Sequence, residues 1–196
     1  MDYNQPGFYH FSDDSIALVK AIEKNEIQIK ESKVSLLDLC AGCGVISIEA
    51  SLSLKEIKDI VFVEIQEEYN SFIQENMKKF LKDKVNYQIK NLALSQYTSD
   101  EPFDLIVCNP PYFIKGEGRI SPNRNKQLCR TFEFDSPQDI IDTMAKNLKE
   151  NGRGYLLVPK GVKAWESVIN KYEKASLLKS LERAEIYLIL KSNTDK

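Results

Sequence analysis

Residues 34–44 read VSLLDLCAGCG, and this stretch decides the fold. Residues 34–40 form a short, nearly continuous apolar run, interrupted by Ser35 and Asp38, which is typical of a strand buried on both faces of a sheet. Gly42 and Gly44 then permit a sharp turn that lets the backbone pass close to a ligand, and a helix is expected from Val45. The glycines are not followed by the lysine and serine or threonine of a phosphate-binding P-loop. An apolar strand that runs through a glycine turn into a helix predicts one unit of a parallel α/β sheet.

Apolar segments of strand length recur along the rest of the chain and alternate with amphipathic segments. The strand-like segments are residues 59–64, 85–90, 103–108 and 153–158. Apolar residues three or four positions apart predict helices between them, at residues 69–81, 136–148 and 162–172. This alternation is that of βαβ units, so we expect a mostly parallel, doubly wound α/β sheet with helices on both faces.

Further sequence signals predict where one helix stops and which elements lie at the two ends of the chain. Asn151 and Gly152 predict the stop of the helix that begins near Ser136. Residues 177–181 and 185–191 follow the last helix and predict an antiparallel C-terminal hairpin, which brings the sheet to seven strands. Residues 12–25 predict an additional helix before the first strand.

Composition narrows the class of protein. The chain has 196 residues with a formal charge of −2, and 42% of them are hydrophobic and 29% charged, which excludes a disordered or fibrous chain. It contains no apolar run of about 18 residues and no basic, apolar signal sequence at its start. We therefore expect one cytoplasmic domain over residues 1–196, with no membrane partner. Residues 1–30 are expected to be a helical extension packed on it, and 110–134 a loop that meets the substrate.

The four cysteines are Cys40, Cys43, Cys108 and Cys129. Cys40 and Cys43 have the spacing of half a zinc knuckle, but no second pair with this spacing follows, and the single histidine, His10, is distant in sequence. We therefore expect reduced, buried thiols and no bound metal.

Polar side chains fall at the ends of the predicted parallel strands, where sheets of this class bind ligands. Glu64 ends the second strand, twenty residues after Gly44, and an acid there can accept both ribose hydroxyls of a nucleoside. Asn91 and Leu92 follow the third strand, where a polar group commonly meets the edge of an adenine. The alternative is that these are ordinary solvated strand ends.

Asn109, Pro110, Pro111 and Tyr112 follow the fourth strand and form the most specific motif of the chain. Two consecutive prolines fix the backbone and remove two amide donors. The side-chain oxygen of Asn109 and the carbonyl of Pro110 remain as neighbouring acceptors, which suit the two hydrogens of a planar amino group. The ring of Tyr112 is expected to stack on a flat group such as a base.

With these strand-end features, the chain resembles the class I adenosylmethionine-dependent methyltransferases, and the tetrad at 109–112 resembles that of enzymes that methylate an amino or amide nitrogen. Residues 5–14 read QPGFYHFSDD and are similar to the glycine-tyrosine-arginine-phenylalanine-serine-x-aspartate opening of the bacterial tRNA1(Val) adenine-N6 methyltransferase family. Residues 109–113 (NPPYF) and 116–123 (GEGRISPN) resemble the same family, so that the resemblance covers about residues 5–159.

The resemblance implies a Rossmann-like methyltransferase fold and a function. It implies S-adenosylmethionine as cofactor, S-adenosylhomocysteine as product, and tRNA as partner, methylated on the exocyclic nitrogen of the adenine just 3′ of the anticodon. The implied cofactor-binding residues are Asp38, Cys40, Gly42, Gly44, Glu64, Ile65, Asn91, Leu92 and Asn109. The implied catalytic residues are Asn109, Pro110, Pro111 and Tyr112.

The chain departs from the family's pattern at three places. Cys40 stands where the family has the first glycine of its Asp-x-Gly-x-Gly-x-Gly loop. Residues 129–132 read CRTF where the family has Ala-Arg-His-Glu, and the chain is shorter than is usual at its C-terminal end.

The stretch from residue 110 to residue 130 is strongly basic although the whole chain is slightly acidic. It carries five basic residues against Glu117 alone, a net charge of +4. The expected RNA-binding residues are Lys115, Arg119, Arg124, Lys126 and Arg130. A basic loop beside the two acceptors predicts contact with RNA phosphates, and the alternative is an ordinary solvated loop.

Three other functions fit parts of this pattern. A protein glutamine methyltransferase uses the same tetrad on a side-chain amide, but does not need the basic loop. An rRNA guanine-amino methyltransferase more often has phenylalanine in place of Tyr112. A catalytically idle RNA-binding protein on the same fold is the third. We expect a monomer or a weak dimer.

Overall fold

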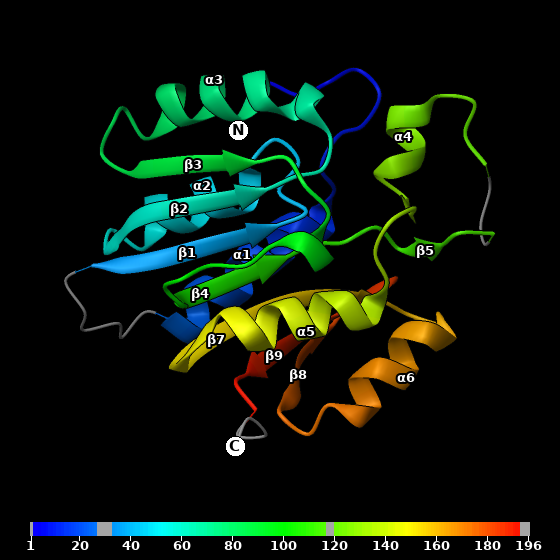
Figure 1. The fold of residues 1–196 in the computed structure, drawn as a ribbon. Coiled ribbons are helices and arrows are strands. Elements are labelled where there is room, and N and C mark those ends of the chain that lie inside the picture. The colour runs from blue at the N-terminus through cyan, green and yellow to red at the C-terminus, as the bar shows by residue number, and fades with distance from the viewer. Residues whose placement is uncertain (1, 27–32, 117–119, 193–196) are drawn as a thin grey trace.

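A computed structural model of the chain describes residues 2–26, 33–116 and 120–192. Its main sheet has seven strands, as the sequence predicted, and their order is β3-β2-β1-β4-β7-β9-β8 (Figure 1). The strands are β1 (Val34–Leu39), β2 (Ile57–Val63), β3 (Asn86–Lys90), β4 (Phe103–Cys108), β7 (Leu148–Pro159), β8 (Ala175–Ser180) and β9 (Ala184–Leu190).

The first five strands of the sheet in spatial order are parallel, and β9 is antiparallel to both β7 and β8. The predicted C-terminal hairpin is therefore present, with its second strand, β9, inside the sheet and its first strand, β8, at the edge. Burial explains this order, because Ile186 and Ile189 of β9 are fully buried, whereas Leu177 of β8 is 52% exposed.

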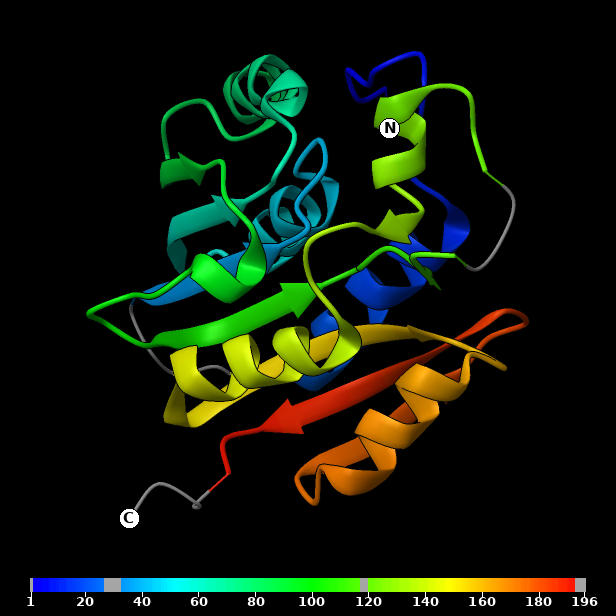
Figure 2. The same cartoon turned by 45° about the vertical axis from the view of Figure 1, so that its right-hand side comes forward.

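Helices cover both faces, which confirms the doubly wound prediction. On one face lie α1 (Asp13–Glu26), α2 (Val45–Ser53) and α3 (Asn70–Phe80), and on the other lie α5 (Pro137–Asn147) and α6 (Lys163–Lys171). Figure 2 shows α5 and α6 in front of the sheet and α1 and α2 behind it. Adjacent residues of β1 point to opposite faces, so that Leu36 packs in one core and Leu37 in the other. Both faces of β1 are buried, as its nearly continuous apolar sequence predicted.

The α5–β7 boundary differs from the prediction. The helix ends at Asn147, and β7 begins at Leu148, so Asn151 and Gly152 lie within a strand and not at a helix stop. Tertiary packing accounts for the difference, because Phe103 at the start of β4 pairs with Leu148. A Cβ atom on Gly152 would lie 2.8 Å from the carbonyl oxygen of Phe103, so the glycine serves the close approach of the two strands.

The strand order reverses between β1 and β4, since the chain builds β1, β2 and β3 outward on one side and continues with β4 on the other. The carboxyl ends of the parallel strands point to the same edge of the sheet, on the right in Figure 1. Residues 110–134, expected as a loop, contain short elements at this edge. These are β5 (Phe113–Ile114), α4 (Arg124–Leu128) and β6 (Thr131–Phe132), with β5 parallel to β6.

Two short 3-10 helices, η1 (Glu67–Tyr69) and η2 (Leu94–Gln96), follow β2 and β3. Within the part of the chain that the structure describes, no helix is long and apolar enough to cross a membrane.

Candidate active site

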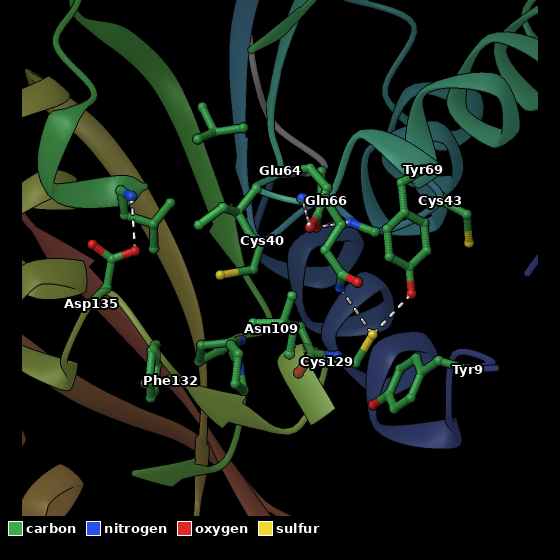
Figure 3. A pocket seen from close by; sticks show the side chains of 18 of the residues that line it. Tyr9, Cys40, Cys43, Glu64, Gln66, Tyr69, Asn109, Cys129, Phe132 and Asp135 are labelled. Carbon is green, nitrogen blue, oxygen red and sulfur yellow. Dashed lines mark hydrogen bonds between the residues drawn. The ribbon is translucent and has the colours of Figure 1, made fainter. Parts of the chain in front are cut away.

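A cavity opens at the carboxyl ends of β1, β2 and β4, where the strand order reverses (Figure 3). This is the place at which open α/β sheets bind ligands. The N-terminal segment supplies one wall through Tyr9, Phe11 and Ser15, and the chain around Cys129 and Phe132 supplies another. Of the residues expected at a site, the following line the cavity together: Cys40, Gly42, Glu64, Ile65, Leu92, Asn109, Pro110 and Pro111.

The loop after β1 bends sharply through left-handed backbone conformations. Cys40, Gly42 and Gly44 have φ angles of +56°, +53° and +78°. Gly44 is buried, and a Cβ atom there would lie 3.2 Å from the Phe62 ring. Cys40, at the position where the resemblance expects a glycine, has a left-handed backbone and lines the cavity.

Glu64 is buried at the floor of the cavity and is held by the backbone. Its Oε2 accepts from the amide of Gly42 at 2.9 Å, and its Oε1 accepts from the amide of Gln66 at 3.0 Å. Burial raises the pKa of the Glu64 carboxyl, and these backbone hydrogen bonds lower it in part. Each carboxylate oxygen has a second lone pair, so the carboxylate can still accept from a ligand.

Gln66 is a cavity residue that the sequence did not single out. Its Nε2 donates to the sulfur of Cys129 at 3.3 Å, and the hydroxyl of Tyr69 lies 3.2 Å from the same sulfur. Its Oε1 is buried, with no hydrogen-bond partner among the described residues. The available signal was an amide side chain two residues after the strand-end acid Glu64.

The tetrad after β4 presents its first three residues to the cavity. Asn109 is half-buried, and its Nδ2 donates to Oγ of Ser15 at 3.0 Å. Tyr112 does not line the cavity, in contrast to the expected stacking face. Its hydroxyl donates to Oδ2 of Asp14 at 3.2 Å, and burial raises its pKa.

Asp38, Gly44 and Asn91, expected near a cofactor, lie behind the cavity wall and do not line it. Asp38 is 1% exposed, accepts from the hydroxyl of Ser47 at 2.6 Å, and has a pKa that burial raises to about 7. The Nδ2 of Asn91 donates to the carbonyl of Glu64 at 2.9 Å and to Oδ1 of Asn70 at 3.0 Å. Asn91 therefore supports the cavity residue Glu64, whereas Asp38 holds Ser47 of α2.

The basic residues expected to meet RNA lie on and around α4. Lys115, Arg124 and Lys126 are exposed, and Arg124 pairs with Glu133 at 3.9 Å. The guanidinium of Arg130 lies 5.9 Å from the centre of the Phe113 ring. Arg119 lies outside the described residues. Among the residues that the structure describes, no group of three or more His, Cys, Asp and Glu side chains is placed to hold a metal ion.

Comparisons with known proteins bear on this arrangement. A protein of Haemophilus influenzae named tRNA1(Val) (adenine(37)-N6)-methyltransferase is 26% identical over 156 residues, which cover 77% of this chain and 66% of that protein. A protein of Trichodesmium erythraeum with the same name is 30% identical over 149 residues, covering 73% and 58%. The chain thus spans between about half and two thirds of the length of the curated relatives it matches.

Among solved structures, a 16S rRNA N2 G1207 methyltransferase of T. thermophilus, in complex with AdoMet and guanosine, superposes with a TM-score of 0.68. It is 18% identical, and the match covers 93% of this chain and 44% of that one. A putative RNA methyltransferase of Pyrococcus horikoshii has a TM-score of 0.61 at 18% identity, covering 98% and 94%. These likenesses show the Rossmann-like methyltransferase fold.

A family model matches residues 17–128, which include β1, the glycine turn, Glu64 and the tetrad. Because this match covers more than half of the chain, the chain belongs to the family described as conserved hypothetical protein 95.

Proposed function

We propose that this chain is an S-adenosylmethionine-dependent methyltransferase that acts on the exocyclic amino nitrogen of an adenine in the anticodon loop of a tRNA of the tRNA1(Val) type. The observation that carries the proposal is the position of Asn109 and Pro110, which line the same cavity as Glu64 and the glycine turn. The curated relatives named for this reaction support the substrate. We place the enzyme in the cytoplasm, as a monomer or weak dimer, with residues 110–134 as its substrate loop.

The residues at the floor of the cavity fit adenosylmethionine. Glu64 retains free lone pairs, and Oε1 of Gln66 is a buried acceptor without a partner among the described residues. Such acceptors complement a ligand rich in hydroxyl and amino donors. Glu64 would accept from the two ribose hydroxyls, while Ile65 and Leu92 supply apolar surface for a base. When bound, the cofactor supplies a methyl group activated by its sulfonium.

The tetrad performs the protein's share of the chemistry in this proposal. Oδ1 of Asn109 and the carbonyl of Pro110 accept the two hydrogens of the substrate amino group and orient its nitrogen. These hydrogen bonds strengthen as the nitrogen gains positive charge, so they stabilise the transition state more than the bound substrate. Neither acceptor changes its protonation state, and the displaced proton leaves to water.

The basic residues of the loop supply the contact with RNA. Lys115, Arg124 and Lys126 are exposed beside the cavity, and an exposed cation can displace the counterions of a phosphate. A glutamine side chain as substrate would not need these charges, and this favours a nucleic acid.

The proposal is tested by incubating the chain with adenosylmethionine and unmodified tRNA, followed by mass spectrometry of the nucleosides. N6-methyladenosine is the expected product. Asn109→Ala should lower the single-turnover rate about a hundred- to a thousandfold with both substrates saturating, because it removes a preorganised acceptor. Asn109→Asp keeps an acceptor and should retain more activity than alanine.

Cofactor binding is measured separately by calorimetry. Glu64→Ala should weaken adenosylmethionine about thirty- to a hundredfold, since a buried carboxylate then no longer accepts from two hydroxyls. If Asn109→Ala fails to transfer the methyl group only because it no longer binds the cofactor, Asn109 is a cofactor-binding residue and not a catalytic one. If the methylated product is guanine or glutamine, the substrate is one of these and not adenine. If the chain binds the cofactor but transfers no methyl group, an idle RNA-binding protein is favoured.

A further inference from the structure

The first turn of α1 contacts both ends of the tetrad. Oγ of Ser15 accepts from Nδ2 of Asn109 at 3.0 Å, across 94 residues of sequence. One position earlier, Oδ2 of Asp14 accepts from the hydroxyl of Tyr112 at 3.2 Å, across 98 residues. Ser15 is 3% exposed, so little water competes for its contact.

The sequence of the tetrad explains why such contacts are needed. Pro110 and Pro111 have no N–H groups, so the middle of the tetrad cannot donate backbone hydrogen bonds to neighbouring strands. The side chains of Asn109 and Tyr112 therefore help to anchor the segment, together with the amide of Phe113, which donates to the carbonyl of Arg130 at 2.9 Å. Both side-chain anchors lead to α1, which precedes β1 in the chain and lies outside the βα units of the sheet.

We propose that Ser15 is a positioning residue for Asn109, and that Asp14 anchors the other end of the tetrad through Tyr112. The inference rests on the proposed function. With Nδ2 engaged by Ser15, Oδ1 of Asn109 remains free to accept from the substrate amino group. Rotating the amide by 180° would turn its NH₂ group toward the substrate amino group, so that donor faces donor and the acceptor is lost.

The position of Asp14 extends the same argument to the carbonyl of Pro110. A rigid Pro110-Pro111 segment held at both ends has one orientation of that carbonyl. Releasing Tyr112 from Asp14 leaves this end held by the backbone amide of Phe113, which donates to the carbonyl of Arg130 at 2.9 Å, so the second acceptor is less firmly directed.

The test is a double-mutant cycle on single-turnover methyl transfer, with cofactor and tRNA saturating. Ser15→Ala should lower the rate about tenfold, the size expected for one lost hydrogen bond. Its cofactor Kd and its KM for tRNA should stay within twofold of the wild type. In an Asn109→Ala background Ser15→Ala should cause no further loss, because Ser15 acts only through Asn109.

Two further variants control the cycle. Asp13→Ala changes an exposed residue of the same helical turn and should leave the rate unchanged. Ser15→Thr keeps the hydroxyl and should recover most of the rate lost in Ser15→Ala. Asp14→Ala, which removes the acceptor of the Tyr112 hydroxyl, is paired with Tyr112→Phe to repeat the cycle for the other anchor, and the two losses should again not add.

Each outcome decides between distinct conclusions. If the wild type is active and Ser15→Ala has the same rate, the positioning role of Ser15 is overturned while the proposed function stands. The same conclusion follows if Ser15→Ala still causes a tenfold loss in the Asn109→Ala background. A rise in cofactor Kd or KM with the rate unchanged would make Ser15 a structural residue of the wall. A wild type that binds cofactor but methylates no nucleic acid or protein overturns the proposed function, and the positioning role falls with it.

Discussion

At the scale of the residue, backbone conformation and burial explain the loop after β1. Gly44 and Gly161 both have left-handed backbones, with φ angles of +78° and +73°. They differ in their surroundings, since a Cβ atom on Gly44 would lie 3.2 Å from the Phe62 ring, whereas nothing lies within 4 Å of one on Gly161. The pair separates conformational strain from steric conflict.

We predict that Gly161→Ala lowers the free energy of unfolding by about 1 kcal/mol, the cost of a left-handed alanine. Gly44→Ala should lower it by about 2 kcal/mol, because the contact with Phe62 adds to that strain. Denaturant unfolding followed by circular dichroism measures both. Equal losses would show that the Phe62 ring shifts at no cost.

Asp38 makes stability depend on pH. Its carboxyl has a pKa raised to about 7 in the folded state by burial, against an ordinary value of 3.8. Between these values the folded chain holds a proton that the unfolded chain has lost, so the stabilisation is complete below pH 3.8 and disappears as the pH rises through 7.

We predict that the wild type loses about 2–3 kcal/mol of unfolding free energy between pH 5 and pH 8 relative to Asp38→Asn. The asparagine stays neutral and can still accept from Ser47. Unfolding curves of the two proteins at several pH values give this difference directly. Parallel pH profiles would mean that Asp38 is ionised in the folded protein.

At the scale of the element, the meeting of β4 and β7 depends on one glycine. A Cβ atom on Gly152 would lie 2.8 Å from the carbonyl oxygen of Phe103 and 3.0 Å from the amide nitrogen of Lys149. Both atoms belong to backbone, so a side chain cannot move aside to relieve the contact.

We therefore predict that Gly152→Ala lowers the free energy of unfolding by about 2 kcal/mol, through displacement of one strand against the other. The neighbouring Asn151 is exposed, so Asn151→Ala should change stability by less than about 0.5 kcal/mol. Thermal unfolding of the two variants beside the wild type is sufficient. If Gly152→Ala lowers the free energy of unfolding no more than Asn151→Ala does, β4 and β7 can shift against each other at little cost.

At the scale of the whole molecule, charge is distributed unevenly. The chain carries −2 in total, yet exposed cations gather around α4 at the carboxyl edge of the sheet. Exposed lysines at the opposite, amino-terminal edge, Lys55 before β2 and Lys84 before β3, provide a natural comparison.

We predict that Arg124→Ala with Lys126→Ala weakens tRNA binding and leaves adenosylmethionine affinity unchanged. Two lost phosphate contacts should reduce the slope of log K against log salt by about 1.4–1.8. Lys55→Ala with Lys84→Ala removes the same charge from the other edge and should leave the slope unchanged. If the two double variants behave alike, net charge rather than the loop attracts the RNA.

The sequence alone determined the architecture and the carboxyl ends of β1, β2 and β4, although not the start of β7. Val34–Leu39 is mostly apolar because it is buried on both faces, and Gly42, Glu64 and Asn109 follow strands whose carboxyl ends meet. These features depend on neighbours within a few residues along the chain. Periodicity therefore reveals them without knowledge of the tertiary path.

Only the tertiary structure decided which polar groups meet across the cavity. It pairs Ser15 with Asn109, turns the hydroxyl of Tyr112 to Asp14, and brings Cys129 to Gln66. These partners lie between 63 and 98 residues apart in sequence. No local pattern marks them, because each side chain's direction follows from how α1 and the chain around α4 pack over the carboxyl edge of the sheet.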